Sequence, residues 1–173
     1  IRELDPDIIT GWNVVDFDLS VLLKLADRLG VPLALGRGPE TLRFRTSNFA
    51  RARNQAGIPG RVVLDGIELL RGAFVRLESY ALDAAAQEIL GKGKTITGSD
   101  RAGEIVHMFK QDRARLVEYN LNDARLVLEI LEKLDLVPLA VERSRLTGMP
   151  PDRVGASIAS FDFLYLSALS ERR

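Results

Sequence analysis

The sequence lacks cysteine altogether, has a single histidine, and has no long apolar run. Without cysteine it can form neither a disulfide nor a thiolate-ligated zinc site. A membrane-spanning helix needs about 20 consecutive apolar residues, so we expect a cytoplasmic protein without a membrane partner. Lys and Arg total 24, as do Asp and Glu, so there is no excess positive charge for wrapping long duplex DNA.

The 173 residues are enough for one domain with a buried core, and β-rich runs alternate with helical patterns, which predicts an α/β fold. Strands are expected at 8–15, 42–46 and 61–66, with a basic loop or hairpin end at 51–60. Pro138 is expected to end the helical region that includes the long helix predicted at 113–134. Helices are expected at 16–30, 67–71, 78–91, 100–111, 113–134 and 154–169.

Asp18 follows the first predicted strand at the turn into a helix, the place where open α/β sheets bind ligands. Asn13 and Phe17 precede it in the order Asn-x-x-x-Phe-Asp. Asp18 suits either a helix N-cap or a metal ligand. Asn13 is suited to hydrogen bonding with a nucleotide, and Phe17 either packs in the core or wedges against a base.

Tyr119 and Asp123 lie one turn apart on the apolar face of the helix predicted at 113–134. A carboxylate on such a face is costly unless it is paired, hydrogen-bonded or bound to a cation. Taken alone, Tyr119 is equally consistent with a half-buried core tyrosine, and Asp123 with an aspartate bonded to backbone or arginine. Together they suggest a metal ion and a water molecule.

Weaker candidates accompany these residues. Lys94 is consistent with a solvated loop lysine, and Arg51 and Arg53 either touch DNA or belong to a solvated basic loop. Asp65, at a strand end, either stabilises the fold or supports the residues of a site from behind them. His107 is expected at the surface or in helix packing.

Residues 11–18 (Gly-Trp-Asn-Val-Val-Asp-Phe-Asp) and 119–123 (Tyr-Asn-Leu-Asn-Asp) resemble the second and third exonuclease motifs of family B DNA polymerases, particularly bacterial members. Residues 60–68, 79–94 and 142–150 extend the similarity. The resemblance implies a ribonuclease-H-like (DnaQ-like) fold and 3′–5′ proofreading with two Mg²⁺ or Mn²⁺ ions.

On the matching positions, the resemblance makes Asp18 and Asp123 metal ligands and makes Tyr119 the residue that orients the attacking water. Asn13, Phe17 and Lys94 become DNA contacts. The partners it implies are a single-stranded DNA 3′ end, primer-template DNA and a polymerase domain of the same chain, in the cytoplasm at the nucleoid.

The family's first motif, Asp-x-Glu on an earlier strand, has no counterpart in this sequence. We therefore expect a fold truncated at its N-terminal strands: a partial exonuclease domain at 1–145 and a linker helix at 146–173 leading towards the polymerase domain. The fragment itself is expected to be inactive because half of the metal ligands are missing. The alternatives are a module that binds single-stranded DNA without cleaving it and a stand-alone nuclease, which the apolar C-terminal helix disfavours.

Overall fold

A computed structural model of the chain describes residues 1–46, 54–92, 101–153, 155 and 157–170. Helices and short strands together make an α/β structure, as the sequence predicts. The chain divides into two compact units. Unit 1 comprises Ile1–Val75 and Leu136–Arg173, and unit 2 comprises Arg76–Asp135.

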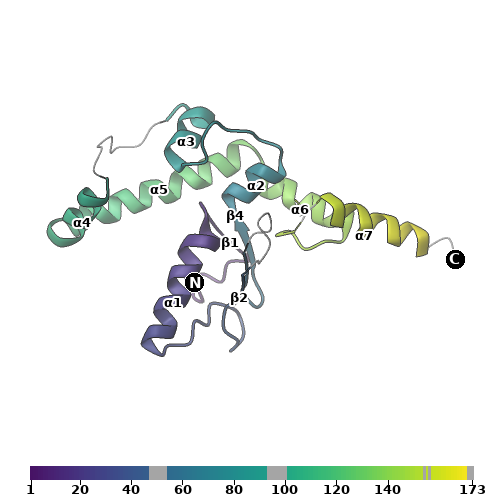
Figure 1. The fold of residues 1–173 in the computed structure, drawn as a ribbon, viewed down its shortest axis with the longest axis horizontal. Coiled ribbons are helices and arrows are strands. Elements are labelled where there is room, and N and C mark those ends of the chain that lie inside the picture. Colours follow the sequence, from purple (N-terminus) through teal and green to yellow (C-terminus); the bar gives the residue numbers. More distant parts are fainter. Residues whose placement is uncertain (47–53, 93–100, 154, 156, 171–173) are drawn as a thin grey trace. The chain divides into compact units, whose positions relative to one another are not determined.

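The strands of unit 1 form two small sheets. β1 (Ile8–Gly11) and β4 (Val62–Asp65) run parallel, with Gly11 opposite Asp65, so both strands end at the same edge (Figure 1). β2 (Arg43–Arg45) and β3 (Gln55–Gly57) pair antiparallel. The sequence did not predict β3 as a strand, because its three residues include no β-branched or aromatic side chain.

The first strand is shorter than predicted. It ends at Gly11, and Asn13 adopts a left-handed conformation (φ 58°), which asparagine tolerates better than most residues. A π-helix, η1 (Val14–Leu19), follows and leads into α1 (Ser20–Leu29), which ends at Gly30 as expected. Asp18 therefore lies late in the π-helix rather than at a simple strand-to-helix turn.

Three further helices belong to unit 1: α2 (Gly66–Gly72), α6 (Leu136–Thr147) and α7 (Ser157–Ser170). α6 packs against both α2 and α7. The prediction that Pro138 ends a helical region is wrong, because Pro138 lies in the first turn of α6, where its missing N–H has no partner to lose. None of the described helices is long and apolar enough to span a membrane.

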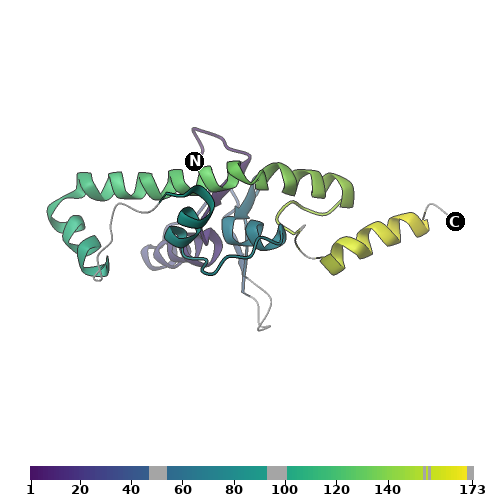
Figure 2. The same cartoon turned by 90° about the horizontal axis from the view of Figure 1, so that it is seen from above.

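Unit 2 consists of α3 (Leu82–Leu90), α4 (Arg101–Gln111) and α5 (Arg113–Lys133). α3 packs against α5, as Figure 2 also shows. Asp112 caps α5 by accepting a hydrogen bond from the Arg115 N–H at 3.0 Å. Ser79 does not cap α3 as predicted; it accepts from Ala81 N–H at 3.2 Å, and the helix begins later at Leu82.

An ion-pair network holds the first residues of unit 1. The Asp5 carboxylate lies 2.9 Å from Arg37 Nε and 2.8 Å from Arg61 Nη1, and the Arg61 side chain is 1% exposed. Arg61 also donates to the carbonyls of Leu35 and Pro6. Arg37 reaches Asp7 at 2.6 Å, so the segment before β1 is fixed to the rest of unit 1.

We expect acid to weaken unit 1 through Asp5. Hydrogen bonds from Arg37 and then Arg61 hold the pKa of Asp5 below its usual range. Its ionised form therefore stabilises the fold above the ordinary aspartate pKa, about 4, and this contribution is lost as the pH falls through the lowered pKa. Urea midpoints measured by Trp12 fluorescence below about pH 4 should fall more steeply in the wild type than in Asp5→Asn.

Trp12 is a suitable probe because it is the only tryptophan in the chain and packs beside Gly66 in unit 1. Asp27→Asn, an exposed change on α1, is the matched control and should keep the wild-type slope. Equal slopes in the wild type and Asp5→Asn would show that the network does not couple folding to pH.

Candidate functional site

The edge where β1 and β4 end carries Asn13, Phe17 and Asp18 on the turn and π-helix that follow β1. Phe17 is 63% exposed, so the interpretation of this ring as a core residue is wrong. Val14 and Leu19, on the same π-helix, are buried and anchor it in the core. The Asn13 side chain does not cap η1, so the local helix does not require its amide.

Asp65 lies at the end of β4, on the same edge as Asp18. Asp65 as a whole residue is 7% exposed, and its carboxylate accepts hydrogen bonds from Val15 N–H at 3.3 Å, Ile67 N–H at 3.1 Å and Glu68 N–H at 3.3 Å. Partial burial raises the pKa of Asp18, and the charge of Asp65 raises it further. Two carboxylates at one edge attract cations, and Mg²⁺ is commonly held by one or two carboxylates together with water and substrate phosphate oxygens.

Tyr119 and Asp123 lie in unit 2 on one side of α5, and both are half-buried. Leu126, Val127, Ile130 and Leu131 continue this side and are buried, which confirms the predicted apolar stripe. Glu118 is exposed on the same helix. The phenol and the carboxylate are thus partly shielded from water, one helical turn apart.

Unit 1 thus presents Asp18, while unit 2 presents Tyr119 and Asp123. Within the described part of either unit, no three His, Asp or Glu side chains gather closely enough to hold a metal ion. His107 is exposed, as expected. Lys94, Arg51 and Arg53 fall outside the described residues.

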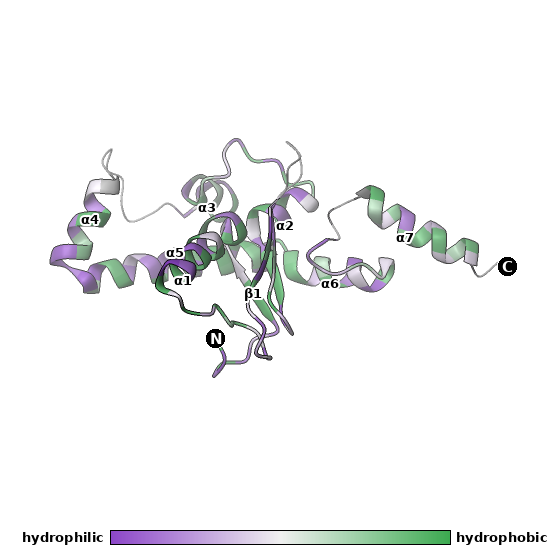
Figure 3. Cartoon of the chain, turned by 60° about the horizontal axis from the view of Figure 1, so that its bottom comes forward, coloured by the Kyte–Doolittle hydropathy of each residue, from purple (hydrophilic) through white to green (hydrophobic). Residues whose placement is uncertain are grey.

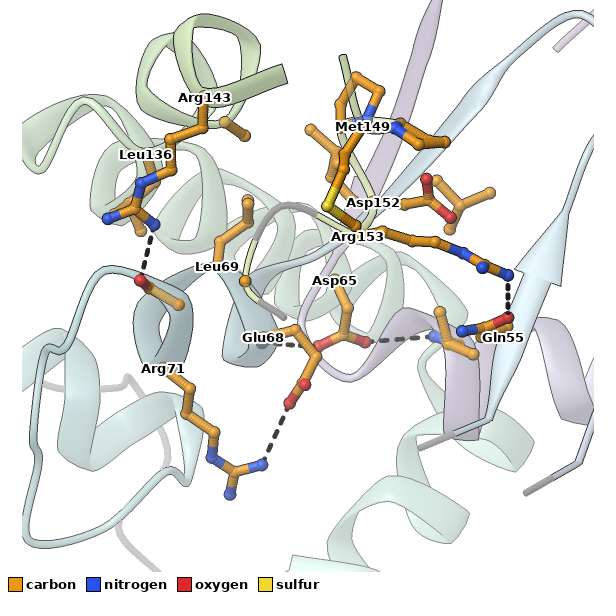
Figure 4. A pocket seen from close by; sticks show the side chains of 18 of the residues that line it. Gln55, Asp65, Glu68, Leu69, Arg71, Leu136, Arg143, Met149, Asp152 and Arg153 are labelled. Carbon is orange, nitrogen blue, oxygen red and sulfur yellow. Dashed lines mark hydrogen bonds and ion pairs between the residues drawn. The ribbon is translucent and has the colours of Figure 1, made fainter. Parts of the chain in front are cut away.

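A cavity of about 710 Å³ in unit 1 adjoins Asp65 and is bordered by α2, α6, β3 and the segment after α6. Three arginines line it, and two of them link separate segments of unit 1 (Figure 4). Arg143 donates to the Gly72 carbonyl at 2.6 Å, Arg153 to Gln55 at 2.7 Å, and Arg71 to Glu68 at 3.2 Å. Sequence reasoning missed this cavity because its lining comes from separate stretches without a shared motif.

Comparison with known proteins agrees with the Asn-x-x-x-Phe-Asp motif at the edge where β1 and β4 end. Residues 1–85 match the model of the DNA polymerase family B exonuclease domain. The chain is a relative of family B DNA polymerases. It is 44% identical to DNA polymerase II of Escherichia coli over 162 residues, which is 93% of this chain and 21% of that protein.

Eukaryotic DNA polymerases match over a similar stretch. The chain is 33% identical to the DNA polymerase delta catalytic subunit of Bos taurus and 32% identical to that of Caenorhabditis elegans, covering 87% of this chain in each case. It spans 14% and 15% of those two proteins. The chain therefore corresponds to about a fifth or less of each of these DNA polymerases.

Proposed function

We propose that this chain contributes to a 3′–5′ proofreading exonuclease, which hydrolyses phosphodiester bonds at DNA 3′ ends within a longer DNA polymerase. The observation that carries the proposal is the match of residues 1–85 to the family B exonuclease domain, with the Asn-x-x-x-Phe-Asp motif at the end of β1. DNA and a polymerase domain of the same polypeptide are the partners that follow, at the nucleoid of the cytoplasm.

In this proposal Asp18 and Asp123 are ligands of a divalent cation, Mg²⁺ or Mn²⁺, which supplies charge stabilisation at the reacting phosphate. Tyr119 holds the attacking water by hydrogen bonding, since its hydroxyl is a poor base at neutral pH. Phe17, exposed beside Asp18, wedges against the terminal base, while Asn13 bonds the nucleotide. Lys94 contacts the phosphate.

The fold we propose is ribonuclease-H-like (DnaQ-like) and truncated at its N-terminal strands. β1 and β4 are its two parallel strands, and among the described residues β1 pairs with β4 alone. Two-stranded sheets are marginal by themselves, which supports a larger sheet in the full-length protein. Residues 1–145 then form a partial exonuclease domain.

Residues 146–173 are proposed to lead towards the polymerase domain. α7 is predominantly apolar along its length (Figure 3). Ile158 is 80% exposed and Phe161 is 64% exposed, and the Phe161 ring stacks on Tyr165 with centroids 5.7 Å apart. Such exposed apolar surface is typical of a segment that packs against another part of a protein.

A module that binds single-stranded DNA without cleaving it is the second candidate. It is favoured by the fact that within the described residues of each unit no three metal-ligating side chains gather. Under the first proposal, the missing ligands belong to the full-length polypeptide. Under the second, they are absent from the full-length protein as well.

An assay on 3′-mismatched single-stranded DNA separates the two candidates. The full-length polypeptide that carries this sequence should release nucleoside monophosphates from the 3′ end with Mg²⁺ or Mn²⁺. The 173-residue chain alone should release none, because it supplies only part of the ligand set. DNA binding by the full-length polypeptide without release would favour the binding module, and robust release by the chain alone would contradict the expected inactivity.

A further inference from the structure

One buried carboxylate serves the first turns of two helices. The first backbone N–H groups of any helix lack partners inside that helix. Asp65 accepts from two of them in α2, those of Ile67 and Glu68, through Oδ1. Its second oxygen, Oδ2, accepts from Val15 N–H in the first turn of η1 at 3.3 Å. Figure 4 shows Asp65 beside Glu68, with dashed lines to the carboxylate marking hydrogen bonds.

This arrangement connects β4 directly to the helix that carries Phe17 and Asp18. β1 and β4 end side by side, with Gly11 opposite Asp65, and η1 begins three residues after Gly11. Val14 and Leu19 hold η1 by apolar packing, which has little directional preference. The hydrogen bond from Val15 is directional and therefore fixes the position of the first turn of η1.

The side chain at position 65 must be acceptor-only for this purpose. An ionised carboxylate offers acceptor sites on both oxygens, whereas an asparagine amide offers one oxygen and two donors. An asparagine remains a good N-cap for α2, but it cannot accept from Val15 and from α2 at the same time with separate atoms. Asp65→Asn should therefore keep the cap of α2 but lose the hydrogen bond that anchors η1.

We propose that Asp65 is a positioning residue of the exonuclease site: it sets η1, and through η1 the place of Asp18 and Phe17 against the DNA end. This inference rests on the proposed function. Asp65 acts through the backbone of η1, not by touching the substrate. Groups that hydrogen-bond the ligands of a metal site typically contribute 10- to 100-fold to activity, and we expect a loss of this order for Asp65.

The test compares Asp65→Asn with Asp112→Asn in the full-length polypeptide. Asp112 is the matched control because it also caps a helix through its carboxylate, but its capping bond reaches only Arg115 of its own helix, α5. Asp65→Asn should lower kcat for nucleotide release by about 10- to 100-fold, with KM for DNA within about twofold of the wild type. Asp112→Asn should retain kcat.

Hydrogen exchange gives a readout that does not depend on activity. In the isolated chain, the Val15 amide should exchange faster in Asp65→Asn than in the wild type, while protection across β4 is kept. Both measurements are made where far-UV circular dichroism shows every variant folded, so that general instability does not account for a loss. If kcat falls equally in both variants, the loss of any helix-capping carboxylate is enough to lower kcat. That result would overturn the inference, because it leaves no specific role for Asp65.

The outcomes also distinguish this inference from the proposed function. If the wild type releases nucleotides and Asp65→Asn keeps wild-type kcat, the positioning role is wrong whether or not Val15 exchange changes. If the full-length wild type releases no nucleotide, the proposed function fails, and the role of Asp65 in that reaction fails with it. Faster Val15 exchange together with a selective loss of kcat supports the inference.

Discussion

Asp123→Asn in the full-length polypeptide should reduce nucleotide release from DNA 3′ ends by at least about 10²- to 10³-fold, the usual loss when one electrostatic group of a reaction site is removed. Asparagine keeps the shape of the half-buried side chain but removes the negative charge that would hold a cation. Asp18→Asn should give a loss of similar size. The double variant should lose little more, because residues that act as one unit are not additive.

Glu118→Gln is the matched control for Asp123→Asn. It removes one carboxylate from the same helix at an exposed position five residues earlier, about 140° around the helix axis. It should leave release within about twofold, since exposed substitutions away from a site have small effects. The measurement is single-turnover release from a labelled, 3′-mismatched strand. Equal losses in Asp123→Asn and Glu118→Gln would contradict a specific role for Asp123.

Leu64→Ala should lower the free energy of unfolding of unit 1 by about 2–5 kcal/mol. Leu64 is 1% exposed and lies in β4, directly before Asp65. Shortening the side chain removes buried apolar surface and leaves a cavity. Since whole domains are stable by only about 5–15 kcal/mol, the loss is a large share for a unit with two short sheets.

Urea unfolding followed by Trp12 fluorescence measures this change within unit 1. Leu29→Ala on α1 is the control, because Leu29 is 70% exposed and should shift stability by no more than about 0.5 kcal/mol. A midpoint for Leu64→Ala equal to that of Leu29→Ala would mean that β4 is not part of the cooperative core of unit 1.

The elements that the sequence predicted well are those with a long periodic pattern or a clear terminating residue. The helix at 113–134 appears as α5, Arg113–Lys133, because its apolar residues recur at three and four. Gly30 and Gly91 end α1 and α3 in the left-handed conformation, as expected for glycine. The strand predicted at 61–66 appears as β4, Val62–Asp65, because its centre is short, apolar and rich in valine.

Other features depend on contacts that no local pattern encodes. Val14 and Val15 have strong strand propensity, yet the left-handed Asn13 turns the chain into a π-helix that buries Val14. Proline breaks a helix when it lies in the helix interior, but Pro138 lies in the first turn of α6, where it is tolerated. The double cap by Asp65 joins residues 50 positions apart in sequence, so only the fold reveals it.

The motifs predict candidate site residues in each unit, but they do not specify how these residues lie relative to one another. Asn-x-x-x-Phe-Asp and Tyr-x-x-x-Asp are specific only as a pair, and a pair in sequence is a hypothesis about proximity in space. That Asp18 and Asp123 act at one cation site is the claim on which the proposed roles of Tyr119 and Phe17 depend.

Thiol cross-linking of the chain tests this claim most directly, because the sequence has no cysteine of its own. Asp18→Cys combined with Asp123→Cys should be bridged within one molecule by a short bis-alkylating reagent, giving a mass and a gel shift that Asp18→Cys with Glu118→Cys does not give. Equal bridging of the two pairs, or bridging of neither, would contradict a shared site for Asp18 and Asp123.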